Sequence, residues 1–151
     1  MMLSTKNKKE IEALYDKDFF LWITTHIDLL KQKKWDLIDI EHLIEELDSM
    51  GKSEICSLAS LFGILFAHLY KWDHFPKSRS KSWINSIEYS QEEINRLLNK
   101  QPSLKSKLNE AIEDGWSYAK KILIDDTNID YRLLPKECPY SFEEAINRKI
   151  E

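Results

Sequence analysis

The apolar positions of the chain recur with the period of long helices. From Ile55 onward they alternate at steps of three and four, which is the spacing of one buried helix face: Leu58, Phe62, Leu65, Leu69 and Trp72. Pro76 ends this helix, because proline lacks the amide that the helical ladder needs and disfavours the helical conformation of the residue before it. The same rhythm extends back to Asp39, a suitable N-cap, so we expect one helix of about 36 residues that bends at Gly51. The alternative is a break at Gly51 and a new helix capped by Ser53.

Four further helices follow from helix caps and apolar stripes. An earlier helix is predicted from about Asp16, its expected N-cap, to Lys33. After Pro76, Ser78 or Ser80 can cap a third helix, and Ser103 can cap a fourth helix that carries Gly115 on its packing face. The stretch Ser141-Phe-Glu-Glu144 is a capping box that begins a short last helix.

The amino-acid composition favours a fold that is made only of helices. Three Gly and four Pro in 151 residues are too few for the turns of a β-sandwich or barrel. We therefore expect an all-α fold, an antiparallel four-helix bundle with an extended C-terminal segment and a short final helix. The expected organisation is one domain over residues 1–151, with residues 1–10 a frayed N-terminal arm and residues 126–151 a C-terminal extension packed on the bundle.

Charge, cysteines and hydropathy narrow the classes of function. The net charge of −4 and a pI near 5.6 give no global basic field, so nucleic acid is not a favoured partner. Cys56 and Cys138 are single thiols, which suggests neither a disulfide framework nor a zinc ribbon. The most apolar run, residues 58–70, is short and interrupted, and the N-terminus has no apolar signal segment. We expect a soluble, cytoplasmic protein that does not enter a membrane.

Histidines and carboxylates are the side chains of this chain that could bind a metal. The Glu-x-x-His pairs of a di-iron bundle are absent, and no cofactor or bound metal is expected. The weak candidates for metal ligands are His26, His42, Glu45 and Glu46, and an exposed, charged first helical turn is the favoured interpretation of the last three. If the first two helices pair closely, Glu46 falls level with His26 and a buried Glu–His pair becomes possible.

The corner around Pro76 is the main candidate for a binding site. It brings together the end of one helix and the start of the next, with six residues that could bind a ligand: His68, Lys71, Trp72, Arg79, Ser82 and Trp83. A histidine beside a lysine, with Glu88 as the expected carboxylate, could titrate near neutral pH, and the cations could hold an anion. The alternative is that these groups only hold the corner together, with Arg79 stacked on a tryptophan.

Several motifs resemble a known family. They are Tyr15-x-x-Asp18-Phe19-x-x-Trp22, Leu37-x-Asp39-x-x-x-Leu43-x-Glu45-Glu46, His68-Leu69-x-Lys71-Trp72, Pro76-x-x-Arg79-Ser80-x-Ser82-Trp83 and Pro135-x-x-Cys138-Pro139-Tyr140. In this order they resemble the bacterial, largely cyanobacterial, family called domain of unknown function 29, over roughly residues 15–146. The resemblance implies a compact all-α domain without an assigned activity. The family often has Gln before the proline, where this chain has Phe75.

The functional expectation is a small binding or protein-interaction module that uses the corner around Pro76. Its partner would be another protein or a second copy of the chain, as a homodimer. Two alternatives remain open at this point: a metal-dependent or acid-base enzyme that uses Glu and His residues, and single-stranded nucleic-acid binding through the cations and aromatics of the corner.

Overall fold

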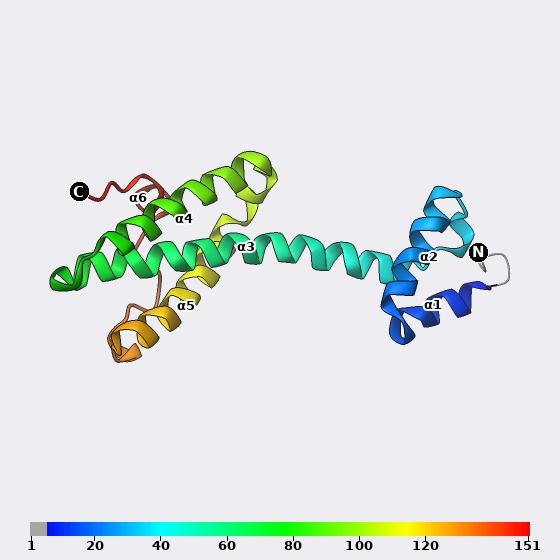
Figure 1. The fold of residues 1–151 in the computed structure, drawn as a ribbon, viewed down its shortest axis with the longest axis horizontal. Helices are drawn as coiled ribbons and strands as arrows, with labels where there is room; N and C mark the ends of the chain where they lie inside the picture. Colours follow the sequence, from blue (N-terminus) through cyan, green and yellow to red (C-terminus); the bar gives the residue numbers. More distant parts are fainter. Residues whose placement is uncertain (1–5) are drawn as a thin grey trace. The chain divides into compact units, whose positions relative to one another are not determined.

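The computed structural model describes residues 6–151, which form six α-helices joined by short 3-10 turns and loops (Figure 1). The α-helices are α1 (Lys8–Lys17), α2 (Phe19–Lys31), α3 (Ile40–His74), α4 (Lys81–Lys100), α5 (Leu108–Thr127) and α6 (Phe142–Asn147). The 3-10 turns are Trp35–Leu37, Pro76–Ser78, Pro102–Lys107 and Tyr131–Leu133. No strand occurs in residues 6–151, so the expected all-α class is confirmed.

The chain divides into two compact units, residues 1–51 and residues 52–151. Unit 1 holds α1, α2 and the beginning of α3, and unit 2 holds the rest of α3 with α4, α5 and α6. The expectation of a single domain stays a prediction. The four-helix bundle is not confirmed in detail, because the first expected helix is two helices and packs within unit 1.

In unit 1, the predicted helix from Asp16 to Lys33 was wrong at its start. Asp16 lies inside α1, and the chain leaves the helical conformation at Asp18, whose backbone has φ −156° and ψ 86°. The Asp18 carboxylate then accepts from the amide of Leu21, 3.1 Å away, and begins α2. Lys8, Lys9 and Glu10 of the expected frayed arm belong to α1, while residues 1–5 lie outside the described part of the chain. The small core of unit 1 consists of Ile11, Leu29 and Ile38, with Leu37 and Leu43 against it.

Helix α3 runs without a break through Gly51, as the apolar rhythm predicted. The amide of Leu43 bonds to the carbonyl of Asp39 and the amide of His42 faces the Asp39 carboxylate, so the predicted cap is confirmed. By length and composition alone, α3 could cross a membrane, and half of its most apolar stretch is buried inside the structure. The core helix of a soluble protein meets the same criterion.

In unit 2, the C-terminal part of α3 is the central element of the core, with α4 and α5 beside it (Figure 1). Its fully buried side chains include Leu58, Phe62, Leu65, Phe66 and Leu69. A Cβ added at Gly115 of α5 would lie 2.6 Å from the Cβ of Phe62, closer than packed atoms approach. Gly115 therefore lets α5 come close to α3, as its place on the packing face predicted.

Caps set most of the remaining boundaries in unit 2. The Ser80 hydroxyl accepts from the amide of Trp83 to begin α4, and the Ser141 hydroxyl accepts from the amide of Glu144 to begin α6. Both predicted caps are confirmed. The predicted Ser103 cap was wrong, because Ser103 belongs to the 3-10 turn Pro102–Lys107 and α5 begins only at Leu108.

Candidate functional site

A network of buried hydrogen bonds joins α2 to the start of α3 in unit 1. Asp39 is 3% exposed, and its Oδ2 atom accepts from the indole Nε1 of Trp22, at 3.0 Å, and from Nδ1 of His42, at 2.6 Å. Its backbone amide donates to Nε2 of His26, at 2.9 Å. Asp39 is therefore both the helix cap that the sequence predicted and the centre of a side-chain network that it did not predict.

His26 is fixed in one tautomer by its two neighbours. Its Nε2 atom must accept, because the partner is the amide N–H of Asp39, and its Nδ1–H must therefore donate to the carbonyl oxygen of Trp22, 2.9 Å away. Both ring nitrogens of this buried, neutral imidazole are thus used within the fold. His26 positions the α2 to α3 connection and has no free nitrogen for a metal or a substrate.

His42 is oriented by contacts on two sides. Its Nδ1–H donates to Asp39, while its ring stacks on Tyr15 with 3.8 Å between ring centroids and 13° between planes. The bond to Asp39 raises the pKa of His42 against the opposing effect of its partial burial. Burial disfavours the ionised form of Asp39, but the bonds from His42 and Trp22 outweigh it, so the pKa of Asp39 is lowered. No hydrogen-bond partner for Nε2 of His42 occurs within residues 6–151, so this nitrogen can accept a proton.

The four weak metal candidates do not come together as one site. Glu46 accepts a hydrogen bond from the Tyr15 hydroxyl, which raises the pKa of Tyr15 to about 12. The suggested Glu46–His26 pair was wrong, since His26 is occupied by Asp39 and Trp22. Glu45 is exposed on α3. In the part of the chain that the structure describes, no group of three or more His, Cys, Asp or Glu residues has the arrangement of a metal site.

The corner around Pro76 does bring the predicted residues together in unit 2. Lys71 is 4% exposed, bonds to Asp126 of α5 at 2.5 Å and lies 5.6 Å from the centre of the Trp83 ring. Burial and the neighbouring Lys71 charge lower the pKa of His68, against the bond from His68 Nδ1 to the Ile64 carbonyl. The carboxylate that faces this pair is Asp126, whereas the expected Glu88 is exposed on α4.

Arg79 makes the contact that is expected if the corner residues only hold the corner together. Its guanidinium carbon lies 4.6 Å from the centre of the Trp72 ring, and its Nε donates to the Trp72 carbonyl at 2.9 Å. Arg79 thereby satisfies a carbonyl in the last turn of α3 and places a cation at the negative end of the helix. Ser82 is exposed on α4. Lys71, Trp72 and Arg79 are engaged within the corner, and ligand binding there stays a prediction.

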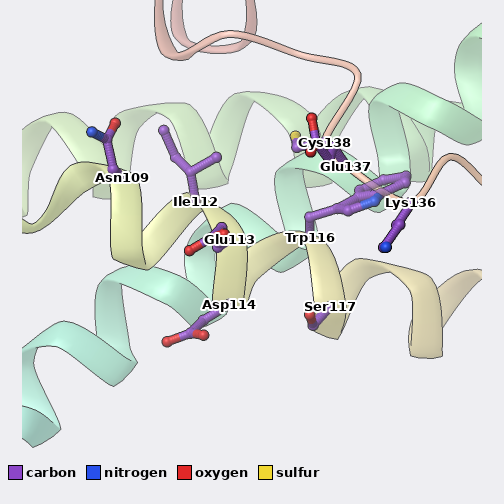
Figure 2. A pocket seen from close by; sticks show the side chains of 9 residues that line it. All are labelled: Asn109, Ile112, Glu113, Asp114, Trp116, Ser117, Lys136, Glu137 and Cys138. Carbon is purple, nitrogen blue, oxygen red and sulfur yellow. The ribbon is translucent and has the colours of Figure 1, made fainter.

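A shallow groove of about 720 Å³ lies between α5 and the C-terminal segment that follows it (Figure 2). Figure 2 shows Asp114 pointing away from Cys138, so the polar side chains do not converge on one point. Burial raises the pKa of Cys138 to about 11, which keeps its thiol protonated at neutral pH. Trp116 also lines the groove, and its indole Nε1 donates to the Pro135 carbonyl at 3.0 Å. These contacts anchor the C-terminal segment.

Unit 1 exposes an apolar row on the N-terminal part of α3. Its members are more than half exposed: Ile40 at 55%, Ile44 at 60%, Leu47 at 58% and Met50 at 65%. We refer to these four residues as the α3 ridge. Ile40, Ile44 and Leu47 lie on a different helix face from His42 and Glu46, which contact Tyr15 of α1, while Met50, four residues after Glu46, lies between the two faces. The apolar rhythm of the sequence extends over this stretch, but periodicity alone does not show that this part of it is uncovered.

These features define an all-helical protein whose buried polar groups are largely committed to its own architecture. The chain belongs to the family described as Domain of unknown function DUF29, whose sequence model matches residues 14–150. No curated protein matches the chain, and no solved structure does. The motif residues quoted for the family contact one another: Trp22 with Asp39, Tyr15 with Glu46, and Trp72 with Arg79.

Proposed function

We propose that this protein is a helical protein-interaction module and that the α3 ridge is its docking surface. The observation that carries the proposal is the exposure of four large apolar side chains in one row on a regular helix. Exposed apolar residues scattered singly are ordinary, whereas a contiguous row marks a surface that is covered by another molecule. The class of function is the one that the sequence favoured, but the surface differs from the corner around Pro76.

The continuity of the helix supports this interpretation. The apolar positions of α3 keep one three-four rhythm from Ile40 to Trp72, and from Leu58 onward that rhythm forms the buried core of unit 2. In unit 2, other helices pack against the apolar face of α3. At Ile44 and Leu47 the same kind of face is exposed. A partner helix on the ridge would bury it in the way that the chain buries the rest of the stripe.

Site-specific photo-crosslinking tests the proposal. A benzoylphenylalanine at position 44 should give one discrete crosslinked product in the cells that make this protein. The matched control places the same group at position 131, because Tyr131 is 67% exposed on a 3-10 turn of unit 2. A product at position 44 that disappears with the added Leu47→Ser change supports docking on the ridge. Equal patterns at both positions, or no product at position 44, would contradict it.

A further inference from the structure

Three residues of the α3 ridge begin a repeat that is typical of a helix-pairing seam. Ile40, Ile44 and Leu47 follow one another at steps of four and three, Gly51 comes four residues further on, and Met50 lies beside this row. These are the steps of a coiled-coil seam, where apolar side chains repeat on average every 3.5 residues. The seam covers three turns, or about 17 Å at 1.5 Å per residue, which is the contact length of a short helix. The geometry of the surface therefore selects a helical occupant.

Gly51 supports a close approach at the end of this seam. A Cβ added at Gly63 would lie 2.2 Å from the Tyr118 ring, and one added at Gly115 would meet Phe62, so these two glycines make room for neighbours within unit 2. A Cβ added at Gly51 would have nothing within 4 Å. Glycine inside a helix costs about 1 kcal/mol relative to alanine, and no neighbour among residues 6–151 explains that cost at Gly51. A second helix that crosses α3 at this point would explain it.

The charge beside the ridge indicates the chemistry of the occupant. Glu41 and Glu45 are both exposed and lie along one edge of the ridge, one and five residues after Ile40. The first 51 positions contain seven lysines and eleven Asp or Glu residues, so this unit carries an excess of negative charge. A second copy of the chain would bring the same carboxylates to the contact, and like charges beside a seam oppose pairing. A partner with cations beside its seam would be attracted instead.

We propose that the α3 ridge binds an amphipathic helix of another protein whose apolar seam is edged by lysine or arginine. This inference rests on the proposed docking function and adds the chemistry of the partner. The apolar seam supplies most of the binding free energy, while the basic edge selects the partner and speeds its encounter with α3.

A pair of synthetic helices tests the charge preference on the full chain. The first is a labelled peptide with leucine at its seam positions and lysine beside them, and the second has glutamate in place of each lysine. A third peptide has the composition of the first in scrambled order. Fluorescence anisotropy should show binding of the lysine helix, and much weaker binding of the glutamate helix and the scrambled peptide.

Variants of the chain connect that binding to the ridge. Leu47→Ser should weaken binding of the lysine helix about tenfold or more, because it removes a central apolar contact. The matched control is Leu133→Ser, since Leu133 is 72% exposed in unit 2 and should leave binding unchanged. The double change Glu41→Lys and Glu45→Lys should reverse the preference towards the glutamate helix. Equal binding of the ordered and scrambled lysine peptides, or no effect of Leu47→Ser, would overturn the inference.

The two proposals can fail separately. Crosslinking at position 44 to a partner without a basic helix would overturn the charge preference and leave the docking function standing. Crosslinking of position 44 to a second copy of the chain, with a dimer in native mass spectrometry, would also overturn the charge preference and leave the docking function standing. Absence of both a crosslinked product and peptide binding would overturn both proposals.

Discussion

The indole of Trp22 donates a hydrogen bond to the carboxylate of Asp39, 3.0 Å away, and both side chains are buried. The bond ties α2 to the first turn of α3. It also gives a structural reason for the presence of both residues in the motifs of the family. The polar residues of unit 1 that could carry chemistry therefore serve first to hold the start of α3 against α2.

Removing the Asp39 carboxylate should destabilise unit 1. Asp39→Ala leaves the buried Trp22 N–H without its acceptor and removes the cap of α3, which together should cost about 2–3 kcal/mol. Urea unfolding followed by circular dichroism measures the change. Asp36→Ala is the control, because Asp36 is exposed in the turn before α3 and should change stability by less than about 0.5 kcal/mol. A similarly small effect of Asp39→Ala would refute the role of the network.

The stability of the protein should depend on the charge of His42. The pKa of His42 is raised in the folded state above its ordinary value of 6.5, so its contribution is fully present below about pH 6.5. That contribution is lost as the pH rises through the raised folded pKa. The free energy of unfolding should therefore fall over this range in the parent chain and fall less in His42→Gln. Identical pH profiles of the two proteins would show that the Asp39–His42 pair is not coupled to folding.

Two glycine-to-alanine changes should have opposite effects. Gly115→Ala places a methyl group 2.6 Å from the Cβ of Phe62 and should cost about 1–3 kcal/mol through overpacking. Gly51→Ala meets no neighbour within 4 Å and should stabilise the isolated chain by about 0.5–1 kcal/mol. Thermal unfolding of the two variants beside the parent tests both values. Stabilisation by Gly115→Ala would contradict the close approach of α5 to α3.

Arg79 should contribute to stability through Trp72. Arg79→Ala removes the stacked cation and the bond to the Trp72 carbonyl, and the expected loss is about 1–2 kcal/mol. Lys81→Ala is the control, since Lys81 is exposed at the start of α4 and makes no ring contact among the described residues. Denaturant unfolding distinguishes the two. Equal stability of both variants would leave Arg79 free for the ligand-binding role that the sequence suggested.

The sequence predicted the long helix α3 well and the helices before it poorly, for one physical reason. The apolar rhythm passes through Gly51, and α3 does too, but a similar rhythm also passes through Tyr15, Phe19 and Trp22, where the chain breaks at Asp18. Periodicity reports which face is apolar and does not report a local turn whose carboxylate starts a new helix.

Contacts between segments that are far apart along the chain were also not predicted from the sequence. The sequence placed Lys71 and Arg79 at one corner, because both are local to Pro76. Asp126, which pairs with Lys71, lies 55 residues further along and depends on how α5 packs. In the same way, Ile44 and Leu58 look alike in sequence, and only the packing shows that Leu58 is buried while Ile44 is exposed.

Whether a partner covers the α3 ridge can be measured by the protection of a thiol at position 47. In a Cys56→Ser background, Leu47→Cys should react rapidly with maleimide in the purified chain and about tenfold more slowly in an extract of the cells that make it. A matched Tyr131→Cys chain should react equally in both. Protection is expected at position 47 alone, and equal reactivity of position 47 in the purified chain and the extract would show that no partner covers the ridge.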